Sequence, residues 1–185
     1  MTDEAMAAAT IRPDGLPAAL VSTERAAEIP AVDDIYGWLI GSWELDVRRY
    51  LVDLTGSGIR GEAHFGRVLE GRGVQDVWIM PRRVERGAPA DPSRNMYGTT
   101  LRLWDPAIEA WRVSWFNPVA GIRDELIGRR QGDTIVQIGS HADGTPIRWI
   151  FSEIATDSFR WTGEALAADG ETWRLEGEFR ARRLV

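Results

Sequence analysis

Hydrophobic and polar positions alternate along most of the chain after residue 41, with the period of two that is typical of β-strands. Trp111, Val113 and Trp115 alternate with polar residues, and residues 172–183 alternate apolar or glycine positions with charged ones. Turn-forming residues separate these runs. The pattern predicts strands over residues 42–53, 60–70, 73–80, 95–104, 110–117, 121–131, 134–141, 146–155, 158–167 and 172–183.

Most connections between these runs are short. Residues 131–133, 142–144 and 168–170 each contain glycine, which tolerates the positive φ of hairpin turns. Consecutive hairpins without intervening helices predict an antiparallel meander. Closure of such a sheet removes its exposed edges. We therefore expect an all-β protein, a single antiparallel meander β-barrel of about 8–10 strands.

The N-terminal part has a different composition. Residues 1–32 contain no aromatic side chain and are rich in alanine, so we predict a flexible N-terminal arm, with a turn or two of helix within 16–29. The length predicts a single barrel domain over residues 33–185. Residues 81–94, with three prolines and four arginines, form either a lid or a plain flexible loop.

A short helix is predicted directly before the first strand. Asp33 and Asp34 are typical of an N-cap and a first helical turn. Ile35, Trp38 and Leu39 then follow at helical spacing. This segment predicts about two helical turns that end before residue 41.

Composition excludes several kinds of chemistry. The 185 residues include no cysteine and no lysine, because all 22 basic residues are arginine. The chain therefore has no disulfide, no thiolate nucleophile and no Schiff-base lysine. No dinucleotide fingerprint or phosphate loop is present, so we expect no cofactor.

Charge and hydropathy limit the classes of partner and the location that we expect for the chain. Residues 1–34 hold seven acidic and two basic residues, most of the net charge of −6, so the body is nearly neutral. Without a basic stripe we expect no nucleic-acid partner. No apolar run is long enough for a membrane span and no signal-peptide pattern is present, so we expect a cytoplasmic protein.

Two segments carry a resemblance to a known fold family. Residues 41–45, Gly-Ser-Trp-Glu-Leu, resemble the start of a lipocalin-like, or calycin, barrel, in which Gly-x-Trp opens the first strand. Residues 159–164 and 169–173 are similar to bacterial calycin-like domains of unknown function. The resemblance covers residues 33–184 and implies that Trp43 plugs the closed end. Proteins of this fold include carriers of apolar ligands, haem-binding barrels and cofactor-free enzymes.

The first candidate site is catalytic and is built on His64. If Gly66 lies opposite Asp76, then His64, Asp76 and Trp78 share the inward face of two adjacent strands. A carboxylate beside an imidazole makes a general acid or base, and Tyr97 is a further candidate. The alternative is a solvated or structurally bonded histidine.

The second candidate site is an aromatic-lined pocket for a small hydrophobic ligand, although the same rings are also expected of a plain core. Its tryptophans come from different predicted strands, and its polar candidates lie on strands or at their ends. The aromatic candidates are Trp78, Trp115, Trp149 and Trp161. The polar candidates are Thr99, Asn117, Arg123 and His141. If the strand that holds Arg123 lines the barrel, either Asp124 or Glu125 must face inward.

Three functions follow from these patterns. The first is a cofactor-independent enzyme of isomerase, cyclase or lyase type that moves protons on a small apolar or aromatic substrate. The second is a non-catalytic barrel that binds a small hydrophobic ligand. The third is a haem or metal binder, for which no metal-ligand spacing is present. An exposed barrel face also permits a homodimer.

Overall fold

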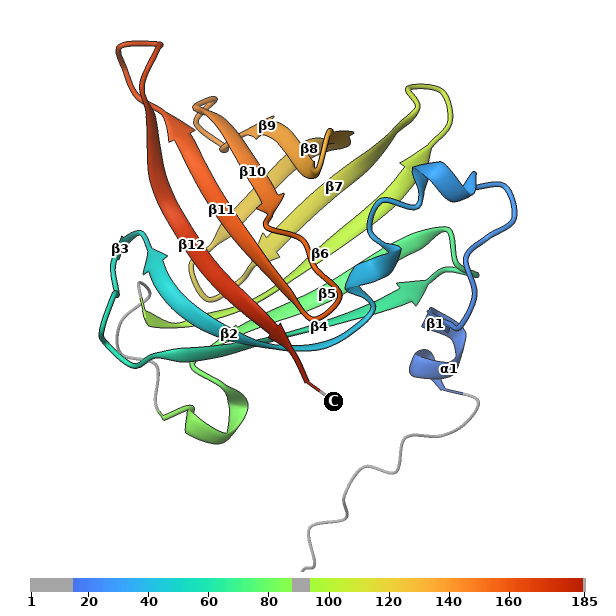
Figure 1. Ribbon diagram of the computed structural model, residues 1–185, viewed down its shortest axis with the longest axis horizontal. Coiled ribbons are helices and arrows are strands. Elements are labelled where there is room, and N and C mark those ends of the chain that lie inside the picture. Colours follow the sequence, from blue (N-terminus) through green and yellow to red (C-terminus); the bar gives the residue numbers. More distant parts are fainter. Residues whose placement is uncertain (1–14, 88–93, 185) are drawn as a thin grey trace, which may run out of the picture.

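A computed structural model describes residues 15–87 and 94–184, in which ten long strands form a closed antiparallel β-barrel (Figure 1). Each long strand pairs with the next along the chain, and β12 returns to β2, which also pairs with β4. The long strands are β2 (Gly41–Tyr50), β4 (Arg60–Val68), β5 (Gly73–Met80), β6 (Met96–Asp105), β7 (Ala110–Asn117), β8 (Ile122–Gln131), β9 (Thr134–Ser140), β10 (Pro146–Ser152), β11 (Ser158–Leu166) and β12 (Trp173–Arg183). The short elements are α1 (Leu16–Leu20), β1 (Val21–Ser22), η1 (Ala31–Asp33), η2 (Gly37–Leu39), β3 (Val52–Asp53) and η3 (Arg83–Glu85).

The predicted all-β meander barrel is confirmed, and most strand limits agree with the alternation in the sequence. The runs predicted over 73–80 and 110–117 coincide with β5 and β7. The run predicted over 42–53 is divided into β2 and β3, because the backbone of Leu51 turns to a φ of 62°. Strand limits are read well here because period-two alternation stops where each hairpin begins.

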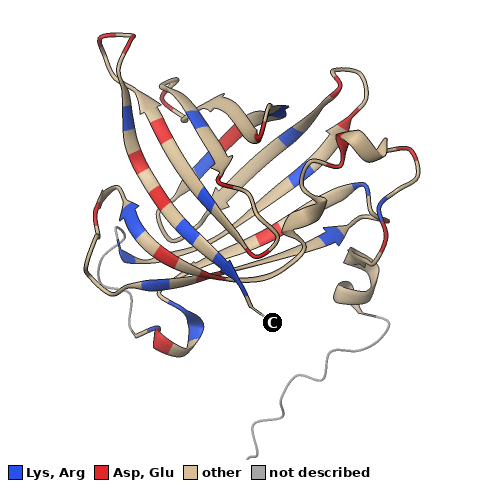
Figure 2. Cartoon of the chain, viewed as in Figure 1, with Lys and Arg blue, Asp and Glu red and all other residues tan. Residues whose placement is uncertain are grey.

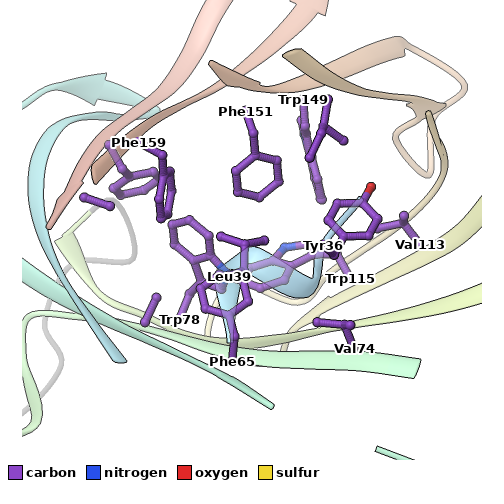
Figure 3. Close-up of a cluster of buried hydrophobic side chains, with 14 of the residues drawn as sticks. Tyr36, Leu39, Phe65, Val74, Trp78, Val113, Trp115, Trp149, Phe151 and Phe159 are labelled. Atoms are coloured by element: carbon purple, nitrogen blue, oxygen red, sulfur yellow. The ribbon is translucent and has the colours of Figure 1, made fainter. Parts of the chain in front are cut away.

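Residues 31–40 close one end of the barrel. Tyr36 and Leu39 are fully buried among core rings (Figure 3). Trp43 Nε1 donates a hydrogen bond to the Leu39 carbonyl over 2.7 Å. The Arg183 guanidinium lies 4.1 Å from the centre of the Trp43 ring, and its nitrogens donate to the carbonyls of Trp38 and Ile40. We call residues 31–40 the plug.

The predicted two-turn helix over 33–40 is wrong in type. The plug forms two short 3₁₀ turns, η1 and η2, instead of one α-helix. Neither acid caps a helix: Asp33 lies within η1, and Asp34, expected in the first turn, turns its carboxylate to Arg67 Nη2 at 2.6 Å. A helix of two turns is costly to nucleate without an N-cap side chain. Two separate turns bury Ile35, Tyr36 and Leu39 instead.

The segment before the plug lies against the barrel where the structure describes it. In Figure 1, α1 and β1 sit beside the outer side of β4, and Val21 pairs with Val68. Ile29 is only 1% exposed. The arm predicted over 1–32 is therefore packed from β1 onward, while its residues 1–14 lie outside the described residues; the domain boundary at residue 32 stays a prediction.

The outer surface carries charges of both signs in alternation. Figure 2 shows acidic and basic residues interleaved along β11 and β12. Arg148 contacts Glu164, and Arg160 Nε donates to Glu178 Oε1 over 2.8 Å. In the described part of the chain, no helix is long and apolar enough to cross a membrane.

Candidate functional site

A cavity lies inside the barrel at the end opposite the plug. Its volume is about 90 Å³, several times the roughly 10–15 Å³ that one water molecule needs in the same measure. It therefore has room for a small molecule. Among the described residues, its lining comprises Tyr50, Leu51, Trp78, Met96, Thr100, Arg102, Trp115, Ile122, Asp124, His141, Trp149, Trp161, Gly163, Glu176, Gly177 and Phe179.

Aromatic rings form a continuous wall of this cavity. The centres of the Trp115 and Trp149 rings lie 6.3 Å apart, those of Trp149 and Trp161 5.7 Å apart, and those of Trp161 and Trp78 5.8 Å apart. Figure 3 shows Trp78, Trp115 and Trp149 projecting into the barrel from separate strands. Such rings supply a large apolar contact area at fixed geometry.

Glycines make room for two of these rings. A Cβ atom at Gly98 would overlap the Trp115 ring, and one at Gly163 would lie 2.7 Å from the Trp161 ring. At both positions the added Cβ atom would come closer to the ring than Cβ atoms in proteins do. Glycine at these positions of β6 and β11 therefore leaves room for the rings of Trp115 and Trp161 inside the barrel.

The floor of the cavity holds a buried ion pair. Arg102 Nη1 lies 2.5 Å from Asp76 Oδ2, and both side chains are almost completely buried. The amide of Thr100 donates to Asp76 Oδ1 over 2.8 Å. The Arg102 guanidinium also lies 5.0 Å from the centre of the Tyr36 ring. These contacts compensate the two charges, so the floor is close to neutral.

At the mouth, the imidazole of His141 lies between two carboxylates. Nδ1 is 2.9 Å from Asp124 Oδ1, and Nε2 is 3.1 Å from Glu176 Oε2. The hydrogen bond with Asp124, reinforced by Glu176 and partly opposed by burial, raises the pKa of His141 to about 9. At neutral pH the group is therefore an imidazolium held by two acids. We call these three residues the His141 clamp.

A neutral pair borders the clamp. Asn117 Nδ2 donates to the hydroxyl of Tyr50 over 2.8 Å, and Asn117 Oδ1 accepts from the amide of Val119. Burial raises the pKa of Tyr50, so its hydroxyl is neutral at pH 7. The asparagine predicted as a ligand anchor thus holds both a lining ring and a loop.

The structure brings some of the predicted site residues together. Trp78, Trp115, Trp149, Trp161 and His141 all line the cavity. Asp76 lies beneath it as the partner of Arg102, and Asn117 is buried at the same end. The four predicted tryptophans therefore line a single cavity.

The predicted inward position of His64 is wrong. Asp76 pairs with Phe65 rather than with Gly66, and this difference of one residue turns His64 to the outer face. There its Nδ1 lies 2.9 Å from Ser42 Oγ and its Nε2 lies 3.1 Å from Glu62 Oε2. Phe65 takes the inward place because its ring packs 5.9 Å from Trp78.

The predicted inward face of β6 is also wrong. Tyr97 is 40% exposed, with the Arg86 guanidinium 5.1 Å from its ring centre, and Thr99 shares its outward face. Thr100 and Arg102 take the inward positions. The sequence favours the other face because Tyr97 and Thr99 share it with the apolar Leu101 and Leu103. The buried partner Asp76 holds Arg102 on the inner face instead.

Arg123 does not reach the cavity either. Its guanidinium lies 5.4 Å from the Phe116 ring and donates to Glu125 on the outer surface. Its neighbour Asp124 is the acid that faces inward and is 3% exposed. Alternation along β8 places Arg123 and Asp124 on opposite faces of the strand. Asp124 pairs with Trp115, which lines the cavity, and therefore shares its inner face.

Sequence reasoning missed Glu176, which strict alternation places on the outer face with Arg174 and Glu178. Across β11, Gly163 pairs with Gly177 and Glu164 with Leu175, so Glu176 is an extra, bulged residue. A bulge re-aims side chains near a barrel rim. The signal available in the sequence is the glycine pair itself, since glycine inside a strand marks such irregularities.

The long connection over 81–94 lies partly outside the described residues, which omit 88–93. In its described part, Arg82 Nη1 binds Glu44 and Arg83 Nε binds Glu62, each on the outer face of the barrel. These contacts hold η3 against β2 and β4, away from the cavity lining.

Comparison with known proteins assigns no relative: no protein-family model matches the chain, and no curated protein matches it. Within the described residues, no group of three or more histidine, aspartate and glutamate side chains has the arrangement of a metal site.

Proposed function

We propose that the barrel binds a small, largely apolar or aromatic molecule and moves protons on it without a cofactor. The observation that carries this proposal is the His141 clamp at the mouth of an aromatic-walled cavity. Acid–base chemistry needs a proton donor and an acceptor within reach of one bound molecule. An isomerase, cyclase or lyase reaction meets that description.

The clamp supplies both roles. His141 is protonated at neutral pH and can donate from a ring nitrogen, while Glu176, with about a third of its side chain exposed, can accept a proton. Asp124 is almost fully buried and holds the ring through Nδ1. In this proposal Asp124 orients His141, and His141 and Glu176 exchange protons with the substrate.

The fold supports a site of this kind. The closed antiparallel barrel is consistent with the lipocalin-like resemblance of residues 33–184, and barrels of this size hold one small ligand. Fold alone does not select between carrier and enzyme. A cytoplasmic location and a homodimer stay predictions.

The second candidate is non-catalytic binding of a small hydrophobic ligand. One observation favours it: both ring nitrogens of His141 already have carboxylate partners, and a pKa of about 9 lies well above neutral pH. General acids work best when their pKa is near the operating pH. Haem is supported less, because His64 lies on the outer face and the nitrogens of His141 face acids.

Hydrogen exchange separates these candidates. The full-length protein is incubated in D₂O with small aromatic ketones and aromatic amines, and loss of C–H signals is followed by NMR. Binding is followed in parallel through tryptophan fluorescence. The enzyme proposal expects exchange that His141→Gln abolishes and that His64→Gln, the outer-face control, leaves unchanged.

Binding without exchange would leave the non-catalytic carrier as the function. Exchange that survives in His141→Gln would remove the clamp from the mechanism. No binding of any compound in the set would contradict both candidates.

A further inference from the structure

The charges that face the cavity do not cancel. At the floor Asp76 and Arg102 neutralise each other at 2.5 Å. At the mouth, however, two carboxylates, Asp124 and Glu176, face the single imidazolium of His141. The lining therefore carries one surplus negative charge. Water screens Asp124 poorly, because it is 3% exposed, and screens the partly exposed Glu176 only in part.

The walls add a second, independent preference. Besides the four tryptophans, the rings of Tyr50 and Phe179 line the same cavity. The faces of aromatic rings are negative, so they attract an organic cation held within about 6 Å. An anionic molecule would meet repulsion from both the carboxylates and the ring faces.

We infer that the ligand of this cavity is a small organic cation with an apolar or aromatic body, such as an amine or a quaternary ammonium compound. This inference rests on the proposed function and names its substrate class. The apolar body packs against the tryptophan wall, and the cationic group lies toward the mouth, where it meets both Glu176 and the ring faces of the lining, Tyr50 among them. The bound cation cancels the surplus negative charge of the lining.

A matched pair of probes tests the inference. Phenyltrimethylammonium and tert-butylbenzene have the same shape and differ in charge alone, and benzoate serves as an anionic probe. Their affinities for the full-length protein are measured by tryptophan fluorescence at low ionic strength. We expect the cation to bind about 2- to 30-fold more tightly than its neutral isostere, and benzoate to bind more weakly than either.

A charge-removing variant locates the effect. Glu176→Gln is expected to weaken the cation about tenfold, the effect of a nearby charge at a partly screened site, and to leave the affinity for tert-butylbenzene unchanged. The unchanged neutral affinity shows that the variant is folded. Glu109→Gln, which removes an exposed carboxylate at the plugged end, is the matched control and should bind the cation as the wild type does.

The outcomes separate this inference from the proposed function. Equal or tighter binding of tert-butylbenzene overturns the cation preference and keeps a binding cavity for neutral molecules. Equal loss of cation affinity in Glu176→Gln and Glu109→Gln also overturns it, because the effect would then be one of net charge. No binding of any probe overturns both the inference and the proposed function.

Discussion

His141 gains its properties from residues that are distant in sequence. Asp124 comes from β8 and Glu176 from β12, and they meet one imidazole that follows β9. The sequence named His141 as a polar candidate of the pocket, and the residue lines the cavity. Its two partners were not predicted, because contact across a barrel mouth depends on strand tilt and on the bulge at Glu176.

The His141 clamp predicts a pH-dependent stability. The pKa of His141 is about 9 in the folded protein and 6.5 in a solvated reference. Its contribution is therefore fully present below pH 6.5 and is lost as the pH rises from 6.5 to 9. Because the ring is about a third exposed, we expect a loss of roughly 1–3 kcal/mol.

Urea denaturation at pH 6 and pH 9.5 measures this loss. The unfolding free energy of the wild type should be lower at pH 9.5 than at pH 6. In His141→Gln the part of this decrease that comes from the histidine should be absent. A loss of the same size in wild type and His141→Gln would show that the clamp does not hold a charged imidazole.

At the scale of the element, the plug determines which end of the barrel is open. Tyr36 and Leu39 fill one end completely, and the Arg183 side chain fastens the plug to β12 through the carbonyls of Trp38 and Ile40. The sequence placed this segment correctly but predicted the wrong helix type. Apolar residues at positions 35, 38 and 39 suit a helical face and also suit two tight turns buried on several sides.

The plug predicts a strong effect of one substitution. Leu39→Ala leaves a hole in a fully buried place, which costs about 2–5 kcal/mol of unfolding free energy. Val32→Ala in the same segment, at an 81% exposed side chain, should change stability by less than about 0.5 kcal/mol. Chemical denaturation of both variants checks this. Similar effects of the two substitutions would mean that the plug does not contribute a packed core.

The pairing between neighbouring strands is the feature of the site that the sequence alone does not predict. The limits of β4 and β5 were predicted well, but Asp76 pairs with Phe65 instead of Gly66. That single-residue difference moved His64 outside and put Phe65 inside. Local alternation gives two faces for each strand, and only long-range packing, such as Phe65 against Trp78, decides which face is buried.

At the scale of the whole molecule, the two ends of the barrel differ in structure. One end is closed by the plug and a dense aromatic core, and the other keeps a cavity with the His141 clamp. The sequence predicted the architecture because hairpin signals and alternation are local properties. The alternation also indicated inward-facing tryptophans on several strands, for which the sequence left a pocket lining and a plain core both open.

The two histidines of the chain offer a direct test of this division, since one lies at the cavity and the other on the outer face. The measurement is an NMR titration of both imidazole rings with phenyltrimethylammonium and, separately, with tert-butylbenzene. Our account predicts that a probe which binds shifts the ring signals of His141 and leaves those of His64 in place. Unshifted His141 signals with both probes, or equal shifts of the two histidines, would contradict it.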